Sequence, residues 1–462
     1  MGDNSLNAIS PIDGRYAAKL TDLKDYFSES AFFKYRIKVE VDYLLFLSKI
    51  KIIRKLSESE TRELKHLYEG FDTAQAQLVK EIEELTNHDV KAVEYYIQKQ
   101  IIKSTLNDIS QYIHFGLTSE DANNIAYSLM ITDFVKTVYL PTIKKLITQL
   151  IELTNNQKAN PILARTHGQP ASPTTLGKEF AVFLNRLTIQ LENLVQITLT
   201  AKLNGATGNF NAHIAAYPEE NWIEHSTAFI KSFGLEPNGV TTQIEPNDNL
   251  AKLFHNIMRI NNIILELDQD CWYYISQQLL ILKPVKNEVG SSTMPHKINP
   301  IDFENSEGNL GIANALLYHL CQTLTVSRLQ RDLSGSTAKR NIGVPLAHTI
   351  LAYKSTLKGL SKIDINPIVQ KNQLHNHPEV LAEAIQTILR KNQDPKAYER
   401  LKELTRGKTI TLAEIQNFIK NLNIEEEDKT RLLELTPESY IGMAEQLAGI
   451  AVKKAKKILE VI

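Results

Sequence analysis

A polar segment with the sequence GSSTMPHKINP occupies residues 290–300 and carries side chains suited to acid–base chemistry. Its leading glycine permits a tight turn, and the hydroxyls of Ser291 and Ser292 follow directly. A serine is a weak base in water and becomes a useful one only where donors or a cation stabilise its alkoxide. Lys297 and Asn299 offer such groups in the same segment. The segment is a candidate catalytic loop, although its spacing alone also fits a solvated linker with serine caps.

Three histidines lie in polar segments, where an imidazole can donate or accept a proton near neutral pH. His167 lies in RTHGQP, His88 in NHD and His114 in HFGLTSED. A hydrogen-bonded structural role is about equally compatible with the first two, and it is favoured for His114, which precedes a phenylalanine. Asn87 or Asp89 would then serve as a cap for the helix that follows.

A cationic segment, RDLSGSTAKRN, lies at residues 331–341. Arginine and hydroxyl side chains together suit a phosphate or a carboxylate. The candidate anion-binding residues are Arg15, Arg331, Ser334, Ser336, Thr337, Lys339 and Arg340. A solvated charged loop is the alternative interpretation of such a cluster.

Several motifs of cofactor-dependent enzymes are missing from the sequence. It has no GxxxxGK[ST] phosphate loop, no GxGxxG, no HExxH and no CxxC. Nucleotide hydrolysis by a P-loop, a dinucleotide cofactor and a standard zinc site are therefore poorly supported. We expect the chemistry to come from side chains alone, with no cofactor and no metal.

Composition indicates a globular protein without a nucleic-acid or membrane-surface role. The 462 residues include 52 Lys and Arg against 53 Asp and Glu, a formal net charge of −1. Cys271 and Cys321 lie inside helical patterns, which indicates buried thiols in a reducing compartment. The amino-terminal residues have no secretory pattern, and no uncharged apolar stretch is long enough to cross a bilayer. We expect a cytoplasmic protein.

Two stretches carry apolar residues at alternating spacings of four and three, which predicts long helices packed in a bundle. The first seam contains Phe180, Leu184, Leu187, Leu191, Leu194 and Thr198. The second contains Leu253, Ile257, Ile260, Ile264, Leu267, Cys271, Tyr274, Gln278 and Ile281.

Further helices are predicted at about 126–155, 306–329 and 344–360, and Pro141 should bend the first of them. The predicted fold is all-α, an elongated central bundle of long helices at residues 113–361. A domain of shorter helices at residues 1–112 precedes it, and a small helical domain at residues 362–462 follows it.

The motifs together resemble a known family. GSSTMPHKINP matches every fixed position of the signature loop GSSxMPxKxNP of the fumarase/aspartase superfamily of lyases. HFGLTSED, ARTHGQPASPTT and GSSTMPHKINPIDFENSEGNLG are similar to the adenylosuccinate lyase family of that superfamily, in its bacterial branch. The similarity runs from SPIDGRY to the carboxyl-terminal LKELTRGK and TPESYIGMA. Gly335 and Ala338 stand where the family pattern predicts bulkier residues.

The resemblance implies an anti β-elimination that cleaves a C–N bond and releases fumarate. It assigns the base to Ser291 and the acid to His167. It places Lys297 and Asn299 at the succinyl carboxylate and His88 at the phosphate or carboxylate end. Residues that would orient the succinyl group and the purine base are Thr118, Ser119, Gln243 and Ser292. Further candidate substrate-binding residues are Asn87, Asp89 and Asn305. Residues that it places at the nucleotide phosphate are Arg15, Tyr16, Arg331, Ser336, Thr337 and Arg340.

The implied reactions are conversion of adenylosuccinate to AMP and of the succinylated imidazole carboxamide SAICAR to AICAR, both in purine nucleotide biosynthesis. Alternatives are a related lyase that acts on fumarate, aspartate or argininosuccinate, a non-catalytic structural protein on the same scaffold, and an unrelated helical binding module. The cationic segment opposes the first, and the intact Ser291, His167 and Lys297 oppose the second.

One chain is not expected to build the whole site. In an up-and-down bundle, the loops with His167 and Ser291 fall at one end, and those with Thr118, Gln243 and Arg331 at the other. Helices of 20 to 30 residues separate these ends by about 30 to 45 Å. We therefore expect a homotetramer with active sites shared between chains, as the resemblance also implies, and no nucleic-acid or membrane partner.

Overall fold

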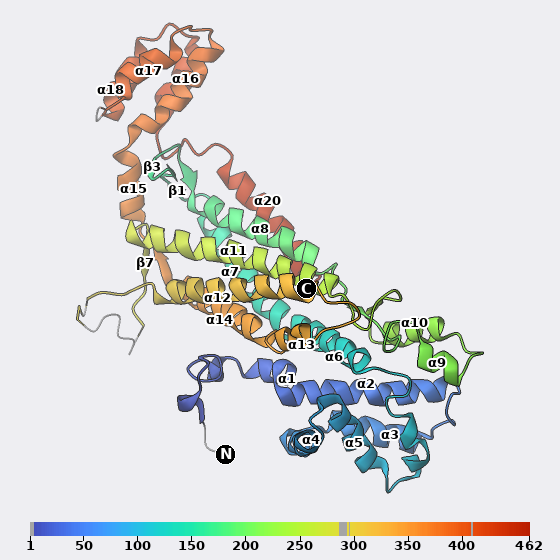
Figure 1. The fold of residues 1–462 in the computed structure, drawn as a ribbon. Coiled ribbons are helices and arrows are strands. Elements are labelled where there is room, and N and C mark those ends of the chain that lie inside the picture. The colour runs from blue at the N-terminus through green and yellow to red at the C-terminus, as the bar shows by residue number, and fades with distance from the viewer. Residues whose placement is uncertain (1–3, 286–292, 295, 408–409) are drawn as a thin grey trace. The chain divides into compact units, whose positions relative to one another are not determined.

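A computed structural model describes residues 4–285, 293–294, 296–407 and 410–462 of the chain (Figure 1). The described part is mainly α-helical, as predicted, with four small two-stranded sheets. It divides into two compact units. Unit 1 contains residues 1–142, 193–261 and 308–352, and unit 2 contains residues 143–192, 262–307 and 353–462. The predicted domain limits at residues 112 and 361 stay a prediction.

Unit 1 begins with short helices. Its helices and strands before α11 are η1 (Asn4–Asn7), η2 (Ala17–Lys19), η3 (Thr21–Leu23), α1 (Lys24–Phe27), α2 (Glu29–Lys49), α3 (Glu58–Glu69), α4 (Thr73–Thr86), α5 (Asp89–Ile101), η4 (Thr105–Tyr112), α6 (Ser119–Phe134), η5 (Val135–Tyr139), β5 (Thr200–Ala201), α9 (Asn211–Ala216), α10 (Trp222–Ser232) and β6 (Glu236–Pro237). Helix α2 packs against α3, α5 and α6, and α4 lies beside α5 (Figure 1). Strands β5 and β6 are parallel, with Thr200 opposite Glu236.

Unit 2 contains the remaining sheets and the carboxyl-terminal helices. Its elements are β1 (Pro161–Ile162), β2 (Arg165–Thr166), β3 (Gln169–Pro170), β4 (Thr174–Thr175), α8 (Leu176–Leu194), β7 (Leu280–Leu282), β8 (Ile363–Ile365), α15 (Pro367–His375), η6 (Pro378–Leu381), α16 (Ala382–Lys391), α17 (Ala397–Thr405), α18 (Leu412–Lys420), α19 (Glu426–Glu434) and α20 (Ala444–Leu459). Strands β1–β4, β2–β3 and β7–β8 pair antiparallel. Helices α16 to α19 surround a small apolar core of their own.

Besides α8, whose last two residues belong to unit 1, four helices have residues in both units. They are α7 (Leu140–Gln157), α11 (Asp248–Ser276), α12 (Ile301–Leu324) and α14 (Gly343–Lys362), and unit 1 also holds the short α13 (Ser334–Lys339). Helix α12 starts at Ile301, five residues before the predicted 306, because a proline disfavours helical backbone in the residue before it and the helix can begin directly after Pro300. It ends at Leu324, five residues before the predicted 329. The predicted 344–360 agrees with α14 within two residues.

The two predicted seams are buried over most of their length. The seam residues Phe180, Leu184 and Leu191 of α8 are buried, and so are Ile257, Ile260, Ile264, Leu267 and Cys271 of α11. Thr198 was a wrong choice, because α8 ends at Leu194 and Thr198 is exposed. Gln278 and Ile281 were wrong for a similar reason. Helix α11 ends at Ser276, and Gln278 takes a left-handed backbone (φ +60°) that leads into β7.

The helix predicted at about 126–155 consists of two α-helices joined by a π-helical turn, and the predicted bend at Pro141 stays a prediction. Helix α6 ends at Phe134, a π-helical turn covers Val135–Tyr139, and α7 resumes at Leu140. Proline lacks the N–H that a continuous helix requires, and a wider turn before it accommodates that loss. Among the described helices, none is long and apolar enough to cross a membrane.

Candidate functional site

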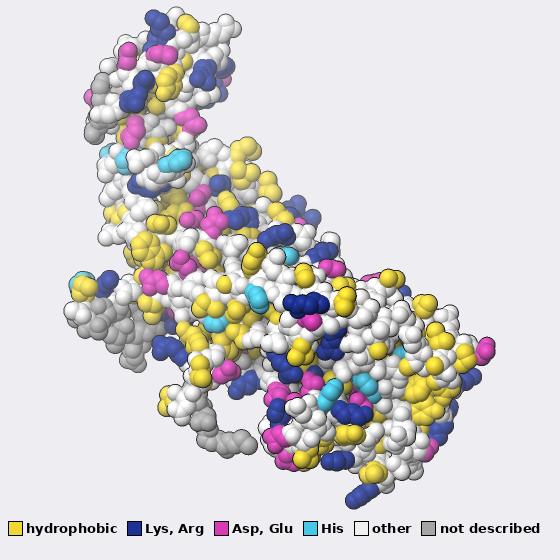
Figure 2. Space-filling model, viewed as in Figure 1, with side chains coloured by type: hydrophobic (Ala, Val, Ile, Leu, Met, Phe, Trp, Pro, Cys, Tyr) yellow, Lys and Arg dark blue, Asp and Glu magenta, His cyan; other side chains and the backbone are white. Residues whose placement is uncertain are grey.

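Unit 1 contains a polar cavity of about 310 Å³, which we call the arginine cavity. Its walls come from α2, the joint between α4 and α5, the first turns of α6, and residues 331–340. Basic, acidic and histidine side chains gather on the surface over α4 and α5 (Figure 2). Seven predicted residues line the cavity, namely Asn87, His88, Asp89, Ser119, Arg331, Ser336 and Arg340. These seven residues come from three segments that are distant in the sequence and converge on one site.

The joint between α4 and α5 presents His88 to the arginine cavity. Asn87 ends α4 in a left-handed conformation (φ +51°), which asparagine tolerates. The expectation that Asn87 or Asp89 caps the next helix was wrong: His88 is the N-cap, and its Nδ1 accepts the Lys91 N–H at 3.1 Å. Because Nδ1 is an acceptor, the neutral ring carries its proton on Nε2. The half-exposed His88 thus offers an N–H donor at the cavity.

Asp89 links two arginines at the cavity wall. Its Oδ2 lies 2.6 Å from Nη2 of Arg36 and 3.0 Å from Nη2 of Arg340. Burial disfavours ionisation of Asp89, but the charge and hydrogen bond of Arg36, with smaller help from the Val90 N–H and Arg340, outweigh it and lower the pKa. Arg36 is buried and also donates from Nε to Asn123 at 2.8 Å. Asp89 is therefore an anion that aligns cations at the cavity.

A second carboxylate, Glu120, binds the cations of the 331–340 segment. Its Oε1 lies 2.9 Å from the Lys339 ammonium, and its Oε2 lies 3.8 Å from Nη2 of Arg331. Burial opposes ionisation of Glu120, but the Lys339 charge outweighs it and its pKa is lowered. Lys339 is buried with this partner, so it is not the solvated cation that the segment alone suggested. Arg331 keeps contact with the cavity and donates to Ser336 Oγ at 3.2 Å.

The charges of the cavity favour an anionic ligand. Its described lining includes the four cations Arg36, Arg331, Lys339 and Arg340 against the three acids Glu83, Asp89 and Glu120. Arg331 and Arg340 retain 23% and 50% of their side-chain exposure, so both can reach a ligand. Arginine with a hydroxyl such as Ser336 is suited to phosphate or carboxylate oxygens. Gly335 has open space around it, and Ala338 is buried, so neither blocks the cavity.

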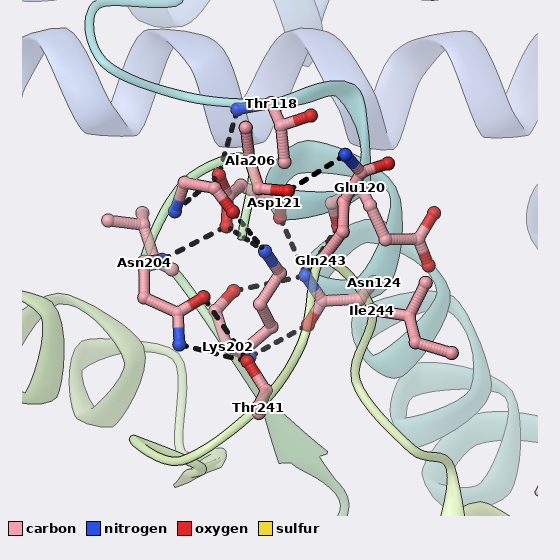
Figure 3. A network of polar contacts seen from close by, with 12 residues as sticks. Thr118, Glu120, Asp121, Asn124, Lys202, Asn204, Ala206, Thr241, Gln243 and Ile244 are labelled. Atoms are coloured by element: carbon pink, nitrogen blue, oxygen red, sulfur yellow. Dashed lines mark hydrogen bonds and ion pairs between the residues drawn. The ribbon is translucent and has the colours of Figure 1, made fainter. Parts of the chain in front are cut away.

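Thr118 and Gln243 lie beside the cavity but do not line it. Thr118 is the N-cap of α6 and donates its backbone N–H to Oδ2 of Asp121 at 2.8 Å (Figure 3). Gln243 donates from Nε2 to the Ala206 carbonyl at 2.9 Å and accepts from Nη1 of Arg331 at 3.1 Å. These two hydrogen bonds orient Gln243 toward Arg331, which lines the arginine cavity.

Arg15, Tyr16 and Thr337 are not among the residues that line the arginine cavity. Arg15 is exposed, and Tyr16 is half-buried just before η2. Thr337 is exposed on α13, with its hydroxyl directed at the Leu333 carbonyl at 3.5 Å. The structure does not bring these three predicted residues to the site within unit 1.

His167 lies at the tip of a hairpin in unit 2. It and Gly168 connect β2 to β3, with φ values of +54° and +75°, the pattern of a type I′ turn. Arg165 stabilises this hairpin by donating to the Gly168 carbonyl at 3.3 Å and to Gln277 Oε1 at 2.9 Å. The His167 side chain is exposed, and within the described part of the chain its imidazole has no hydrogen-bond partner. The His167 imidazole is therefore accessible, as a group that donates a proton to a bound substrate has to be.

Lys297 and Asn299 line a second cavity, of about 330 Å³, in unit 2, which we call the Lys297 cavity. Its described wall comes from residues 282–285, 296–303 and 359 and from Lys362, which lies 2.7 Å from Asp302 Oδ2. The predicted Ser291 and Ser292 lie outside the described residues. Asn305 is one turn into α12 and is not among the lining residues.

Several lining residues escaped sequence reasoning, among them Arg36, Glu120 and Asn123. Arg36 occupies a core position of α2, next to the buried Phe33 and Ile37. A charged side chain at core spacing is costly to bury unless it is paired, and this was the signal that could have identified it. Among the described residues, no group of three or more His, Cys, Asp or Glu side chains is arranged to hold a metal ion.

Two known protein families match successive parts of this chain. Residues 14–314 match the family described as Lyase, and residues 327–441 match the family described as Adenylosuccinate lyase C-terminal. The chain is 48% identical over 447 residues to the adenylosuccinate lyase of Legionella pneumophila strain Philadelphia 1, covering 96% of this chain and 98% of that protein. It is 46% identical over 445 residues to that of Escherichia coli K12, with the same coverage.

Solved structures agree with the fold. A fumarate lyase from Mesorhizobium sp. BNC1 superposes with a TM-score of 0.75 at 17% identity, covering 94% of this chain and 97% of that one. A 3-carboxy-cis,cis-muconate lactonizing enzyme from Pseudomonas putida superposes with a TM-score of 0.75 at 18% identity, covering 95% and 97%. At these identities the likeness concerns the fold alone.

Proposed function

Because this chain belongs to the adenylosuccinate lyase family, we propose that the arginine cavity of one chain and the Lys297 cavity of another bind opposite parts of a succinylated nucleotide and that His167 and Ser291 carry out its cleavage. The chain is a fumarate-releasing C–N lyase of purine nucleotide biosynthesis. The proposed substrates are adenylosuccinate, which yields AMP, and SAICAR, which yields AICAR. The roles of individual residues and the assembly are the content of the proposal.

The observation that carries the proposal is the arginine cavity. Seven of the residues predicted to contact substrate line it together, and its partly exposed Arg331 and Arg340 are arranged for an anion. We assign the nucleotide phosphate to Arg331, Ser336 and Arg340. Ser119 and the Nε2–H of His88 then supply further hydrogen-bond donors to the same ligand.

The chemical step needs a base and an acid on opposite sides of the bond that forms. The base, Ser291, takes the proton from the carbon next to a carboxylate, and the resulting dianionic aci-carboxylate forms the C=C bond of fumarate. The electrons of the C–N bond leave with nitrogen, which receives a proton from His167. Lys297 and Asn299, at the Lys297 cavity, suit the succinyl carboxylate and its developing charge. Ser292 would orient the same group.

We also propose that the active sites form only in a homotetramer. Gln243 precedes α11, which is one continuous helix of 29 residues and hence about 43 Å long, and β7 follows it. Loops at the two ends of such a helix cannot share one small-molecule site within a chain. Exposed apolar side chains on the long helices offer surface for other copies, namely Val182, Ile189, Trp272, Tyr273, Ile312 and Tyr318. Arg15 and Tyr16 fit this scheme as residues contributed to a neighbouring chain's site.

Ultraviolet monitoring of adenylosuccinate cleavage by the purified chain tests the reaction, and Ser291→Ala tests the base. The variant should bind substrate with a near-normal Kd and lose nearly all turnover, because no other hydroxyl takes the carbon-bound proton. Full activity of this variant would remove Ser291 from its role. Parallel fumarate-release assays with aspartate and argininosuccinate should give no product. A cytoplasmic location stays a prediction that cell fractionation tests.

A further inference from the structure

An ion pair between Asp121 and Lys202 lies fully buried behind the arginine cavity, and neither residue lines it. Lys202 Nζ lies 2.9 Å from Asp121 Oδ1, and both side chains have 0% exposure. Removing two charges from water is costly, and hydrophobic replacements are often as stable. A buried pair of this kind beside a site therefore calls for an explanation other than stability.

Asp121 gathers backbone donors from two segments of the chain. Its Oδ2 accepts the Thr118 N–H at 2.8 Å, which caps α6, and the Gly205 N–H at 3.1 Å. Its Oδ1 accepts the Asn204 N–H at 3.1 Å in addition to the Lys202 ammonium. The carboxylate is thus bonded on both oxygens, and it joins the start of α6 to residues 202–205 (Figure 3).

Residues 202–208 continue this connection to Gln243. Lys202 Nζ donates to the Gly205 carbonyl at 2.9 Å, which fixes the turn at Gly205 (φ +83°). Asn204 Nδ2 donates to Thr241 Oγ1 at 2.9 Å. A Cβ on Gly208 would lie 2.1 Å from the Thr241 carbonyl oxygen, so the two segments are in close contact there.

This series of contacts ends at Gln243, a residue that we expect to bind substrate. The Ala206 carbonyl accepts Nε2 of Gln243, which leaves Oε1 of Gln243 to accept from Arg331. At the other end, the capping bond of Asp121 sets the first turn of α6, where Ser119 lines the cavity. One buried carboxylate–ammonium pair is connected to both walls through hydrogen bonds of 2.8 to 3.1 Å.

We propose that Asp121 and Lys202 are positioning residues, which hold the Thr118–Ser119 turn and Gln243 at a set separation for the nucleotide. The inference rests on the proposed function and deepens it. Neither residue touches substrate in this account. Their effect passes through residues 202–206 and the 241–243 loop, so loss of the pair disturbs substrate binding without removing any catalytic group.

The test measures KM and kcat of Lys202→Met, Gln243→Ala and the double variant with adenylosuccinate. Methionine keeps the apolar stem and removes the ammonium. Lys202→Met should raise KM at least tenfold while kcat falls less, and Gln243→Ala should add little in its background, because both act on one contact with substrate. Unchanged KM in folded Lys202→Met, or effects of the two substitutions that simply multiply, would overturn the proposal.

A matched control separates positioning from general stability. Glu60 is also the third residue of a capping box, on α3, and it is also paired with a cation, Arg54, at 2.7 Å. Glu60→Gln should lower the thermal midpoint and leave KM and kcat within twofold of wild type. A Glu60→Gln effect on KM as large as that of Lys202→Met would refute a specific positioning role.

A second variant keeps the test decisive if Lys202→Met does not fold. Thr241→Val preserves the side-chain shape and removes the hydroxyl, which accepts from the Asn204 amide and donates to the Thr242 carbonyl at 2.9 Å. It should raise KM by a smaller factor, about threefold, as one neutral hydrogen bond would give. An unchanged KM for folded Thr241→Val would count against the proposal. If wild type itself released no fumarate, the proposed function would fail instead, and the two failures are thus distinguishable.

Discussion

Arg36 and Arg340 bind the same oxygen of Asp89, one from inside the helical core and the other from the cavity wall. The buried arginine keeps Asp89 ionised, and the ionised Asp89 orients the half-exposed Arg340. The Asp89 carboxylate therefore connects the buried Arg36 to Arg340, which we propose binds the nucleotide phosphate.

Asp89→Asn is the direct check of this arrangement. The amide keeps its shape but removes the charge that Arg36 and Arg340 share, so unfolding free energy should fall by about 1–3 kcal/mol, measured by urea titration. KM should rise because Arg340 is no longer held. Asp108→Asn is the control, since Asp108 pairs with Arg54 at an exposed site, and it should change stability by no more than about 1 kcal/mol. Equal effects of the two substitutions on KM would contradict the linkage.

His167→Asn tests the proposed acid without disturbing the hairpin. Asparagine tolerates the left-handed backbone that His167 has at the turn, so the thermal midpoint should change little. The value of kcat should fall by about 10²–10⁴-fold, the usual contribution of an acid–base group. His66 is an exposed residue of α3, and His66→Asn should leave kcat unchanged. Retention of wild-type kcat by His167→Asn would show that another group protonates the leaving nitrogen.

Mixing two inactive variants tests the shared active site. Ser291→Ala and Arg331→Ala should each be nearly inactive, and subunit exchange should restore about a quarter of wild-type activity if different chains supply the two residues independently. Light scattering should show a tetramer before and after mixing. Continued inactivity in mixtures whose exchange has been verified by mass spectrometry would place both residues in one chain's site.

His114 provides a prediction for pH. Burial alone would lower its pKa, but the charge and hydrogen bond of Glu40, with the nearby Glu94, raise the pKa to about 9. A folded pKa above the unfolded 6.5 stabilises the fold fully below pH 6.5, and this contribution is lost as pH rises through about 9. The unfolding free energy should fall by about 2–4 kcal/mol across that window. His114→Gln should flatten this dependence, and an equally steep curve in the variant would exclude His114 as its source.

Gly359→Ala tests the packing beneath the Lys297 cavity. A Cβ at this position of α14 would lie 2.8 Å from the ring of Phe303, and both residues line that cavity. Overpacking should cost about 1–3 kcal/mol of unfolding free energy and raise KM. Gly449→Ala on α20 meets open space, so it should stabilise by about 0.5–1 kcal/mol and leave KM unchanged. A neutral Gly359→Ala would mean that the ring moves aside freely.

The expected helices were recoverable from the amino-acid order because their signal is local. Apolar spacing of three and four residues marked the buried faces of α8 and α11, and Pro141 lies just after the π-helical turn between α6 and α7. Helix ends were less accurate, as Thr198 and Gln278 illustrate, because a terminus depends on one residue's backbone conformation. His88 capping α5 in place of its neighbours is a further case.

Some features of the candidate site could likewise be predicted from the sequence, and others depend on the tertiary structure. Residue types alone indicated candidate anion-binding arginines, candidate acid–base histidines and polar segments, since those chemical properties belong to single side chains. The meeting of Arg36, Asp89 and Arg340, the withdrawal of Lys339 into a pair with Glu120, and the Asp121–Lys202 link were decided only by tertiary packing. Partners separated by 53 to 251 positions carry no mutual periodicity, and their energy depends on a burial that exists only once the helices have packed.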